Sequence, residues 1–340
     1  MDMTSSKTAL VLGATGGIGG AIATALQRHG WQVRGMARNA EAGRKSNPQL
    51  DWVAGDAMVA ADVIAAAHGV SPIVHAVNPP GYRNWAQLVL PMIDNTIAAA
   101  RAAGGARILL PGTIYNFDPA TTPVIDANTP QRARSRKGLI RIALEQRLAD
   151  AAPEVPSLVL RAGDFFGPGT RSSWFAQAMI KPGTPVRRIA ELARGPGHSW
   201  AYLPDLAETA AQLLDHPDRL LPFERVQFEG LYDASGTMLC TAIAEVVGHP
   251  LPHSRFPWWL MQLLAPFGGF PREAAELAAH WKHPGRLDNT RLVQLLGAEP
   301  RTPLNTALCA ALIDLGCLEQ QTPTFIATSA TTGNPAAGAP

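Results

Sequence analysis

The chain has 340 residues, which suits a core domain that carries a smaller companion domain. Hydrophobic residues make up 46% of it and charged residues 16%, which excludes an intrinsically disordered protein. The net charge of +2 is too small for a general nucleic-acid-binding protein. The three cysteines have no metal-like spacing, so we expect a reducing, cytoplasmic location, no disulfides and no metal site.

No part of the sequence favours a membrane protein. The N-terminal residues lack the pattern of a signal peptide, and the most apolar later stretch, 257–270, is too short to cross a bilayer and contains proline and glycine. We therefore expect no membrane contact, and we interpret 257–270 as a buried helix or a pocket lid.

In the first half of the chain, strand-like and helical segments alternate. Strand-like runs occupy 8–13, 31–37, 51–56, 71–77, 106–111 and 156–163. Helical spacing occupies 17–30, a segment ending near 68, 86–103, and a segment from the basic run at 132–141 to about 150. Strands that alternate with helices of this length pair in parallel with right-handed crossovers. The prediction is a doubly wound, Rossmann-type α/β fold.

After about residue 165 proline and glycine become dense and this alternation stops. The later segments are mostly helical: 236–248, 256–265, 271–283, 288–296 and 303–315. We expect a Rossmann-type domain at 1–165, to which 198–230 returns, and a smaller, mostly helical C-terminal lobe from 166–197 and 231–319. The tail at 320–340 is rich in Thr, Ala, Gly and Pro, which is typical of disorder.

A glycine-rich loop follows the first strand-like run. Gly13, Gly16 and Gly19 are three residues apart, where the chain passes from strand to helix. Glycine there allows a tight turn, a close approach of the backbone to a pyrophosphate, and close packing of helix on strand. The N-terminus of the helix then faces the anion. The predicted contacts of this loop with a dinucleotide are Gly13, Thr15, Gly16, Gly17, Ile18 and Gly19.

The end of the second strand selects the cofactor. A carboxylate there binds the ribose 2′-hydroxyl of NAD(H), whereas a guanidinium accepts the 2′-phosphate of NADP(H). The sequence has Arg38 at this place and no acid before Glu41. NADP(H) is therefore preferred over NAD(H), the alternative being a surface arginine that contacts nothing.

With these residues placed, the sequence resembles the extended or atypical short-chain dehydrogenases/reductases, the NAD-dependent epimerase/dehydratase family, from residue 8 to about 315. The resemblance is carried by GATGGIGG at 13–20, GD at 55–56, Asn95, RAGDFFGPG at 161–169 and HSWAYLPDLAET at 198–209. It implies further cofactor contacts from Asp56, Ala57, Ala76, Val77, Asn78, Gly163 and Phe165.

The same resemblance aligns Lys137 with the lysine of the family's Y-x-x-x-K motif. In the family this lysine binds the nicotinamide ribose and lowers the pKa of the tyrosine, which shuttles a proton. This chain departs from the pattern, because Ala133 stands at the tyrosine position and Pro111 at that of the partner serine or threonine. Thr113 is the nearest hydroxyl to the second position. Tyr115 is either the substitute proton donor or a structural or substrate-wall residue, and Tyr202 and Tyr82 are weaker candidates for the donor.

The other basic residues of 132–141 have three interpretations. Arg132, Arg134, Arg136 and Arg141 form a solvated face, or they bind a phosphate or carboxylate of the substrate, or, least favoured, they bind nucleic acid. Residues expected around the substrate are Tyr82, Trp85, Tyr115, Phe166, Trp174, His198 and Tyr202, and their aromatic character favours an apolar substrate. His280 and His283 have no metal-like partners and are interpreted as ordinary residues near a helix end.

Three functions follow from these residues. The first is an NAD(P)(H)-dependent oxidoreductase that transfers a hydride to or from a small apolar carbonyl, alcohol or enone. The second is a nucleotide-sugar epimerase or dehydratase, and the third is a non-catalytic NADP(H)-binding regulator, which the absence of the aligned tyrosine favours. We expect a small-molecule substrate, no nucleic acid, and a homodimer as one form of assembly.

Overall fold

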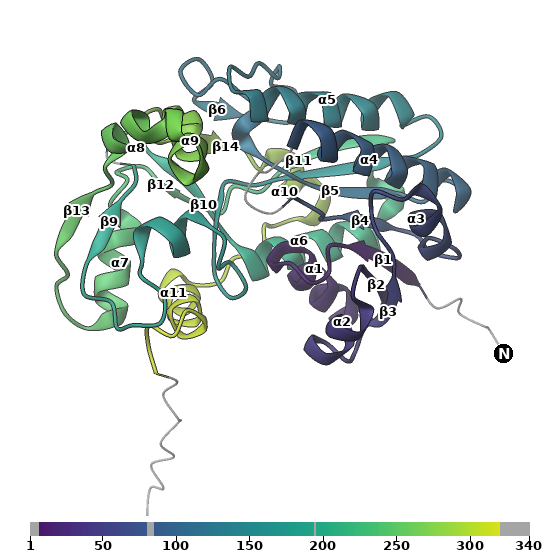
Figure 1. The fold of residues 1–340 in the computed structure, drawn as a ribbon, viewed down its shortest axis with the longest axis horizontal. Helices are drawn as coiled ribbons and strands as arrows, with labels where there is room; N and C mark the ends of the chain where they lie inside the picture. Colours follow the sequence, from purple (N-terminus) through teal and green to yellow (C-terminus); the bar gives the residue numbers. More distant parts are fainter. Residues whose placement is uncertain (1–6, 80–84, 194, 320–340) are drawn as a thin grey trace, which may run out of the picture.

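The computed structural model describes residues 7–79, 85–193 and 195–319 (Figure 1). A parallel seven-stranded sheet forms its centre. The strands are β1 (Thr8–Leu12), β2 (Gln32–Ala37), β3 (Asp51–Ala54), β4 (Ile73–His75), β5 (Ile108–Gly112), β7 (Ser157–Arg161) and β11 (Phe223–Gln227). The tail at 320–340 and Tyr82 lie outside the described residues.

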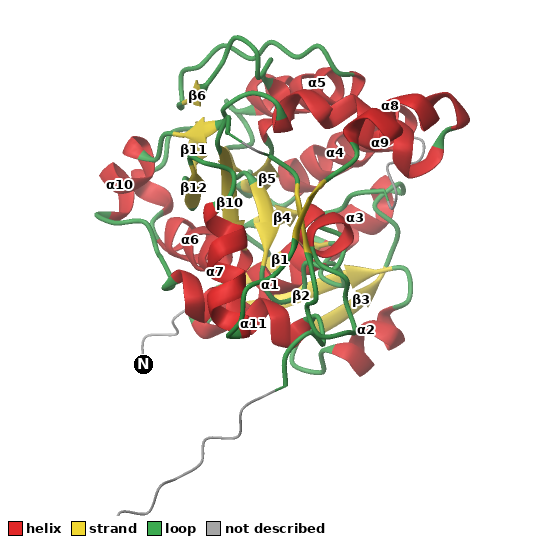
Figure 2. Ribbon diagram, turned by 90° about the vertical axis from the view of Figure 1, so that its left-hand side faces the viewer, coloured by secondary structure: helices red, strands yellow, loops and turns green. Residues whose placement is uncertain are grey.

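Helices cover both faces of this sheet (Figure 2). One face carries α1 (Gly17–Arg28), α6 (Leu203–Asp215) and α10 (Thr290–Leu296). The other carries α3 (Ala60–Ala66), α4 (Trp85–Ala102) and α5 (Arg136–Ala151), and α2 (Ala40–Ser46) packs beside β2 and β3. Because the middle strands are covered on both sides, runs such as TALVL and SLVLR are almost continuously apolar and buried.

The strand order is β11-β7-β5-β4-β1-β2-β3. The chain builds outward from β1 to β3, then returns to place β4 on the other side of β1. Ligands of open α/β sheets bind beyond the carboxyl ends of the strands at such a switch point. The loops after β1 and β4 therefore border the expected cofactor site. The predicted Rossmann-type fold is confirmed.

The second lobe follows β7 and stands apart from the sheet in Figure 1. Its helices are α7 (Met238–Val247), α8 (Trp258–Leu264), α9 (Gly269–Leu277) and α11 (Leu304–Asp314), with a π-helical turn at Phe175–Met179. Outside the central sheet the described residues also contain short strands that the sequence did not predict. They are β8 (Asp164–Phe166), β10 (His198–Tyr202) and β12 (Leu231–Asp233) in one sheet, β9 (Ile189–Glu191) with β13 (His253–Arg255), and β6 (Val124–Ile125) with β14 (Arg286–Leu287).

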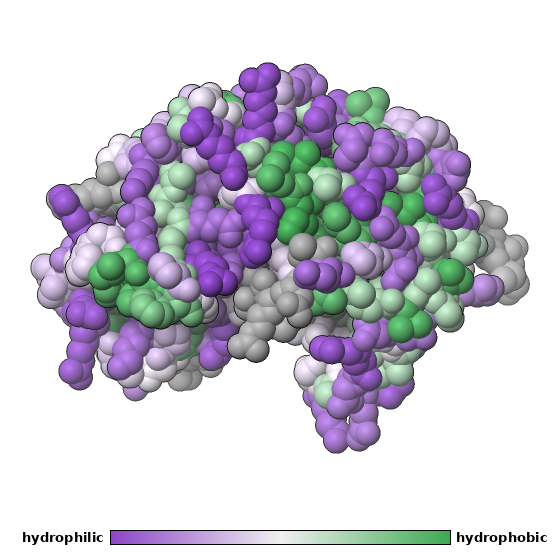
Figure 3. All heavy atoms as spheres, turned by 45° about the horizontal axis from the view of Figure 1, so that its top comes forward, coloured by the Kyte–Doolittle hydropathy of each residue, from purple (hydrophilic) through white to green (hydrophobic). Residues whose placement is uncertain are grey.

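Hydrophobic side chains are exposed where α8 leads into the next turn. Trp259, Leu263 and Phe267 are 69%, 64% and 87% exposed, the highest values among the large hydrophobic side chains of the described residues. Figure 3 shows hydrophobic surface gathered in separate patches between charged side chains. The segment 257–270 is thus only partly buried: no residue of α8 is fully enclosed. No helix among the described residues is both long and apolar enough to cross a membrane.

Candidate cofactor and active site

The glycine loop packs tightly against two strands. Gly13 has φ +86°, a left-handed conformation that favours glycine, and a Cβ there would lie 2.6 Å from the carbonyl oxygen of Ala76, directly after β4. A Cβ on Gly19 would lie 2.3 Å from the carbonyl oxygen of Gly13. Side chains at either position would push α1 away from the strand ends, so both glycines serve this close approach.

The start of α1 is open to an anion. Gly16 is its N-cap and supplies no side-chain cap, and the first turn contains no acidic residue. Thr15 and Gly16 are exposed, whereas Ile18 is partly buried against the core. The amide groups and the positive end of the helix dipole are what a pyrophosphate needs.

Gly17 also meets the second lobe. A Cβ on it would lie 2.2 Å from the carbonyl oxygen of Gly169, in the loop that follows β8. The loop containing Gly169 therefore packs directly on the first turn of α1. The glycine loop is therefore flanked by the residues after β4 on one side and by the Gly169 loop on the other, while Thr15 and Gly16 stay exposed.

Arg38 and Asp56 occupy the ends of the next strands. Arg38 is exposed directly after β2, and among the described residues it makes no hydrogen bond or ion pair. Asp56 follows β3 and accepts a hydrogen bond from the amide of Met58 at 2.9 Å. Asn95 of α4 donates to the carbonyl oxygen of Ala57 at 2.9 Å and so fixes this loop. Arg38 and Asp56 thus lie where the adenosine half of a dinucleotide is expected.

The residues predicted to border the nicotinamide follow β4 and β7. Ala76 and Val77 are partly buried and Asn78 is exposed. Gly163 is enclosed, because a Cβ there would lie 2.1 Å from the carbonyl oxygen of Ser199. Phe165 is partly buried against the core. Their roles as cofactor contacts stay predictions.

Lys137 lies in the first turn of α5 and is 1% exposed. Its ammonium group forms ion pairs with Glu273 and with Glu276, the latter at 3.2 Å. Glu276 also accepts a hydrogen bond from the Lys137 amide at 2.9 Å. A buried charge needs such partners, and here α9 of the second lobe supplies them. The sequence did not reveal Glu273 and Glu276, whose only signal is a spacing of three residues on one helix.

Tyr115 lies at the head of the same helix. It belongs to the 3₁₀ turn η2 (Ile114–Asn116), which follows β5, and a Cβ on Gly138 of α5 would lie 2.1 Å from the Tyr115 carbonyl oxygen. Thr113 caps this turn: its hydroxyl accepts from the Tyr115 amide at 3.5 Å. The structure thus brings Lys137, Tyr115 and Thr113 to one end of the sheet.

A buried polar network holds this turn. Arg161 of β7 and Glu145 of α5 are 1% and 2% exposed and pair at 2.8 Å. Arg161 also donates to the Thr113 carbonyl oxygen at 2.6 Å. Asn116 donates to Glu145 at 2.8 Å, and Gln131 donates to the other oxygen of the same carboxylate. β5, β7, α5 and the turn that carries Tyr115 are therefore locked together.

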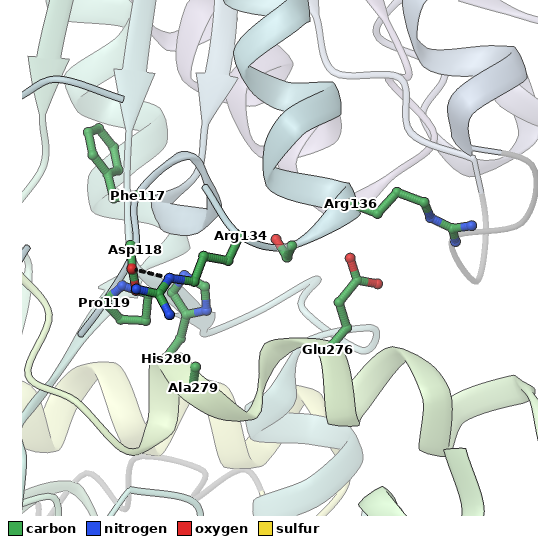
Figure 4. A pocket seen from close by; sticks show the side chains of 9 residues that line it. Phe117, Asp118, Pro119, Arg134, Arg136, Glu276, Ala279 and His280 are labelled. Atoms are coloured by element: carbon green, nitrogen blue, oxygen red, sulfur yellow. Dashed lines mark ion pairs between the residues drawn. The ribbon is translucent and has the colours of Figure 1, made fainter. Parts of the chain in front are cut away.

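An open pocket of about 400 Å³ lies between the head of α5 and the second lobe (Figure 4). Its lining residues are Phe117, Asp118, Pro119, Arg134, Ser135, Arg136, Glu276, Ala279 and His280. Asp118 and Arg134 form an ion pair at 2.6 Å on one wall, drawn as a dashed line in the figure. His280 lies beside this pair, and Glu276 faces it from the other side. Sequence reasoning took His280 for an ordinary helix-end residue and missed this position.

The basic run divides into separate environments. Arg132 and Arg136 are exposed, and in Figure 4 the Arg136 guanidinium points away from Arg134. Arg141 lies over the ring of Trp85, with its guanidinium carbon 5.3 Å from the ring centroid. Beside it, burial and then Arg141 lower the pKa of His75 to about 3. The run is therefore neither a uniform surface patch nor a single clamp.

The predicted substrate residues are buried to different degrees. Trp85, Phe166 and His198 are at most 3% exposed, so their side chains are enclosed by the protein. His198 pairs with Asp164 at 2.7 Å and stacks on Trp281 with ring centroids 3.9 Å apart.

Trp174 and Tyr202 are partly buried. Trp174 contacts Phe256, Trp258, Phe270 and Trp281 in one aromatic cluster. Burial raises the pKa of Tyr202, and Asp205 adds to the effect. A substrate role for these side chains stays a prediction.

Comparison with known proteins gives a family match for part of the chain. Residues 13–143 match the family model described as NAD(P)H-binding. A Streptomyces protein, 3-diazoavenalumate denitrifying reductase, is 29% identical over 177 residues, which are 47% of this chain and 57% of that protein. The match thus spans little more than half the length of this relative.

Solved structures share the fold over nearly the whole chain. A nucleoside-diphosphate-sugar epimerase from Pseudomonas aeruginosa is 19% identical, with a TM-score of 0.67 over 92% of this chain and 99% of that one. UDP-glucose 4-epimerase from Bifidobacterium longum, solved with NAD⁺ and UDP, is 14% identical, with a TM-score of 0.66 over 92% and 98%. At these identities the likeness establishes the fold and leaves the reaction open.

Proposed function

Because the chain carries an NAD(P)H-binding domain in the fold of the extended short-chain dehydrogenases/reductases, we propose that it is an oxidoreductase that uses NADP(H). Its substrate is a small apolar carbonyl, alcohol or enone. The observation that carries the proposal is the fit of the glycine loop: Gly13 and Gly19 leave no room for a Cβ, and the start of α1 has neither a cap nor an acid. No side chain of the described residues caps the start of α1. A pyrophosphate has the charge and shape to bind there.

In this proposal, residues around the glycine loop contact different parts of the cofactor. Arg38, exposed and without an ion pair among the described residues, supports a contact with the 2′-phosphate and hence NADP(H) over NAD(H). Asp56, held by the loop that Asn95 fixes, faces the adenosine half. A nicotinamide bound at the far end supplies or accepts a hydride there.

The chain must then hold and move one proton. In this proposal Tyr115 delivers the proton to the substrate, and the Arg161–Glu145 network fixes the turn that carries it. The charge of the Lys137 ammonium group at the head of α5 is balanced by Glu273 and Glu276, so in this proposal it lowers the pKa of Tyr115 only when it moves away from these carboxylates. Its pairing with Glu273 and Glu276 joins the second lobe to this end of the sheet.

A second candidate follows from the missing tyrosine. The Streptomyces relative is named as a denitrifying reductase of a diazo compound, and Ala133 stands where the family's proton donor is expected. Reductive loss of N₂ from an aromatic diazonium group consumes a hydride and forms a C–H bond, and it needs no proton from the protein. An aromatic diazo substrate is therefore consistent with an alanine at position 133.

The test begins with binding. Equilibrium dialysis of the purified protein with NADPH and NADH is expected to show retention of both, NADPH more tightly. Turnover is then followed as NADPH oxidation with aldehydes, ketones, enones and an arenediazonium salt. Tyr115→Phe should abolish carbonyl reduction and spare diazonium reduction. Product formed without net cofactor change would indicate an epimerase, and tight binding without turnover would indicate a regulator. Retention of neither nucleotide would overturn the proposal.

A further inference from the structure

Two carboxylates of the second lobe withdraw Lys137 from solvent. Its ammonium group pairs with Glu273 and Glu276 of α9, and in Figure 4 the Glu276 side chain points from α9 toward the head of α5. The Lys137 side chain is 2% exposed, whereas both carboxylate side chains are only partly buried. The other four lysines of the chain are exposed: Lys7, Lys45, Lys181 and Lys282. The carboxylates of α9 therefore occupy an ammonium group that would otherwise be available to a ligand.

The helix that carries these carboxylates lies outside the hydrophobic core of the second lobe. Among the described residues, that core includes Trp281, just beyond α9, but not Ala274 and Leu277, the buried residues of α9 itself. The helix packs mainly on α8 and on the turns at its two ends. Phe270, near its start, contacts the ring of Trp174 but is 45% exposed. α9 is therefore a surface helix, and its ion pairs with Lys137 are contacts that hold it on the first domain.

Two glycines directly precede the first full turn of this helix. Gly268 and Gly269 have φ +83° and +63°, and a Cβ on either would lie at least 3.7 Å from any atom beyond its chain neighbours. Glycine can exchange such a conformation for others at little steric cost, and hinges are short segments that absorb changes of this kind. The glycine pair therefore supplies a hinge on one side of α9, while the buried Trp281 fixes the other side.

We propose that α9 is a gate over the head of α5, latched by the ion pairs of Glu273 and Glu276 with Lys137. When α9 turns away about Gly268 and Gly269, the ammonium group leaves its carboxylates and can meet a ligand. The inference rests on the proposed function, because the ligand admitted is the nicotinamide end of NADP(H) together with the substrate. Only the open fraction of molecules binds, so the latch lowers the apparent affinity for the nucleotide by that fraction.

Amine labelling measures the opening of the gate without any cofactor. A short pulse of an acetylating reagent, read by peptide mass spectrometry, reports how often Lys137 reaches solvent, and the four exposed lysines are internal standards. The double variant Glu273→Gln/Glu276→Gln removes both charges and keeps the side-chain volumes. Labelling of Lys137 relative to the standards should rise at least about tenfold, because breaking a buried ion pair costs more than this ratio requires. Glu41→Gln, which breaks the exposed pair with Lys45, is the control and should change nothing at Lys137.

Thiol labelling distinguishes the opening of α9 from unfolding of the whole lobe. Cys240 of α7 is 1% exposed in the core of the second lobe, and Cys309 is exposed and serves as the reference. In the double variant Cys240 should stay as protected from a maleimide as in the wild type. A folded variant in which Lys137 stays protected would overturn the gate, and so would Lys137 and Cys240 becoming reactive together. If the double variant does not fold, Glu273→Gln alone is measured in the same way.

Nucleotide binding then tests what the gate admits. In equilibrium dialysis the double variant should bind NADPH more tightly than the wild type, in proportion to the labelling of Lys137, because more molecules are open before binding. Glu41→Gln should bind NADPH as the wild type does. Faster labelling of Lys137 with unchanged NADPH affinity would overturn the proposal that α9 controls this site. If the wild type retains neither nucleotide, the proposed function fails on its own, and the labelling result still decides whether α9 opens.

Discussion

Glu145→Gln tests how much the buried hydrogen-bond network beneath Tyr115 contributes to the free energy of unfolding. The carboxylate of Glu145 accepts from Arg161, Asn116 and Gln131, and it is 2% exposed. Glutamine preserves the volume but places an NH₂ group against these donors. The one remaining oxygen cannot serve all three donors, and Arg161, 1% exposed, loses its charged partner. Breaking one partner of a buried ion pair costs about 3–5 kcal/mol.

That cost is a large part of the 5–15 kcal/mol, roughly, that stabilises a typical domain. Urea denaturation followed by circular dichroism measures it. Glu154→Gln is the matched control, since the Arg101–Glu154 pair is 51% and 67% exposed and should contribute only about 0–1 kcal/mol. If both variants lose less than about 1 kcal/mol, the network does not hold the turn as described. A Glu145→Gln protein that still folds should also lose carbonyl reduction, because Tyr115 is no longer fixed.

Three further predictions concern the cofactor site and the packing of α1. Arg38→Ala should weaken NADPH binding about 10- to 150-fold, the value of a charge-assisted hydrogen bond, and leave NADH binding unchanged; equal losses in dialysis would refute a 2′-phosphate contact. Gly19→Ala should abolish retention of both nucleotides and cost about 1–3 kcal/mol, since its Cβ would lie 2.3 Å from a main-chain oxygen, whereas Gly285→Ala, with nothing within 4 Å, should do neither. The last prediction is a pH dependence at His29. Burial lowers the pKa of His29, but hydrogen bonds to two carboxylates of α6 outweigh this and raise it above 6.5. Protonated His29 should therefore stabilise the fold fully below pH 6.5, and this stabilisation should vanish as pH rises through the folded-state pKa. The difference in melting temperature between wild type and His29→Gln should shrink over that range, and a constant difference would contradict the pairing.

The local signals in the sequence predicted the core of the fold. Alternating apolar runs and helical periods specify strand–helix units, and handed crossovers leave few ways to connect them. The glycine spacing indicated the loop whose Gly13 and Gly19 pack against strand backbone. Position relative to β5 was enough to bring Tyr115 near the head of the Lys137 helix, because parallel strands end at the same edge of the sheet.

The parts that the sequence did not predict depend on contacts between distant segments. The partners of Lys137 lie 136 and 139 residues away on a helix whose acids look like ordinary surface residues. The pocket that His280 lines is formed by segments near 118, 135 and 279, which are far apart in the sequence. Most of the short strands outside the central sheet have two or three residues, which are too few for an alternating pattern to be recognised. The exception is β10, whose five residues were interpreted as part of a family motif.

The contact between Gly17 and the main chain of Gly169 ties together two loops that are 152 positions apart in the sequence. A substitution in one loop therefore constrains which residues the other loop can carry. Replacement of Gly17 by any larger residue would have to be accompanied by a rearrangement of the segment around Gly169. Attempts to redesign the nucleotide preference of this protein by grafting a glycine loop from another enzyme should therefore transfer both segments as a unit.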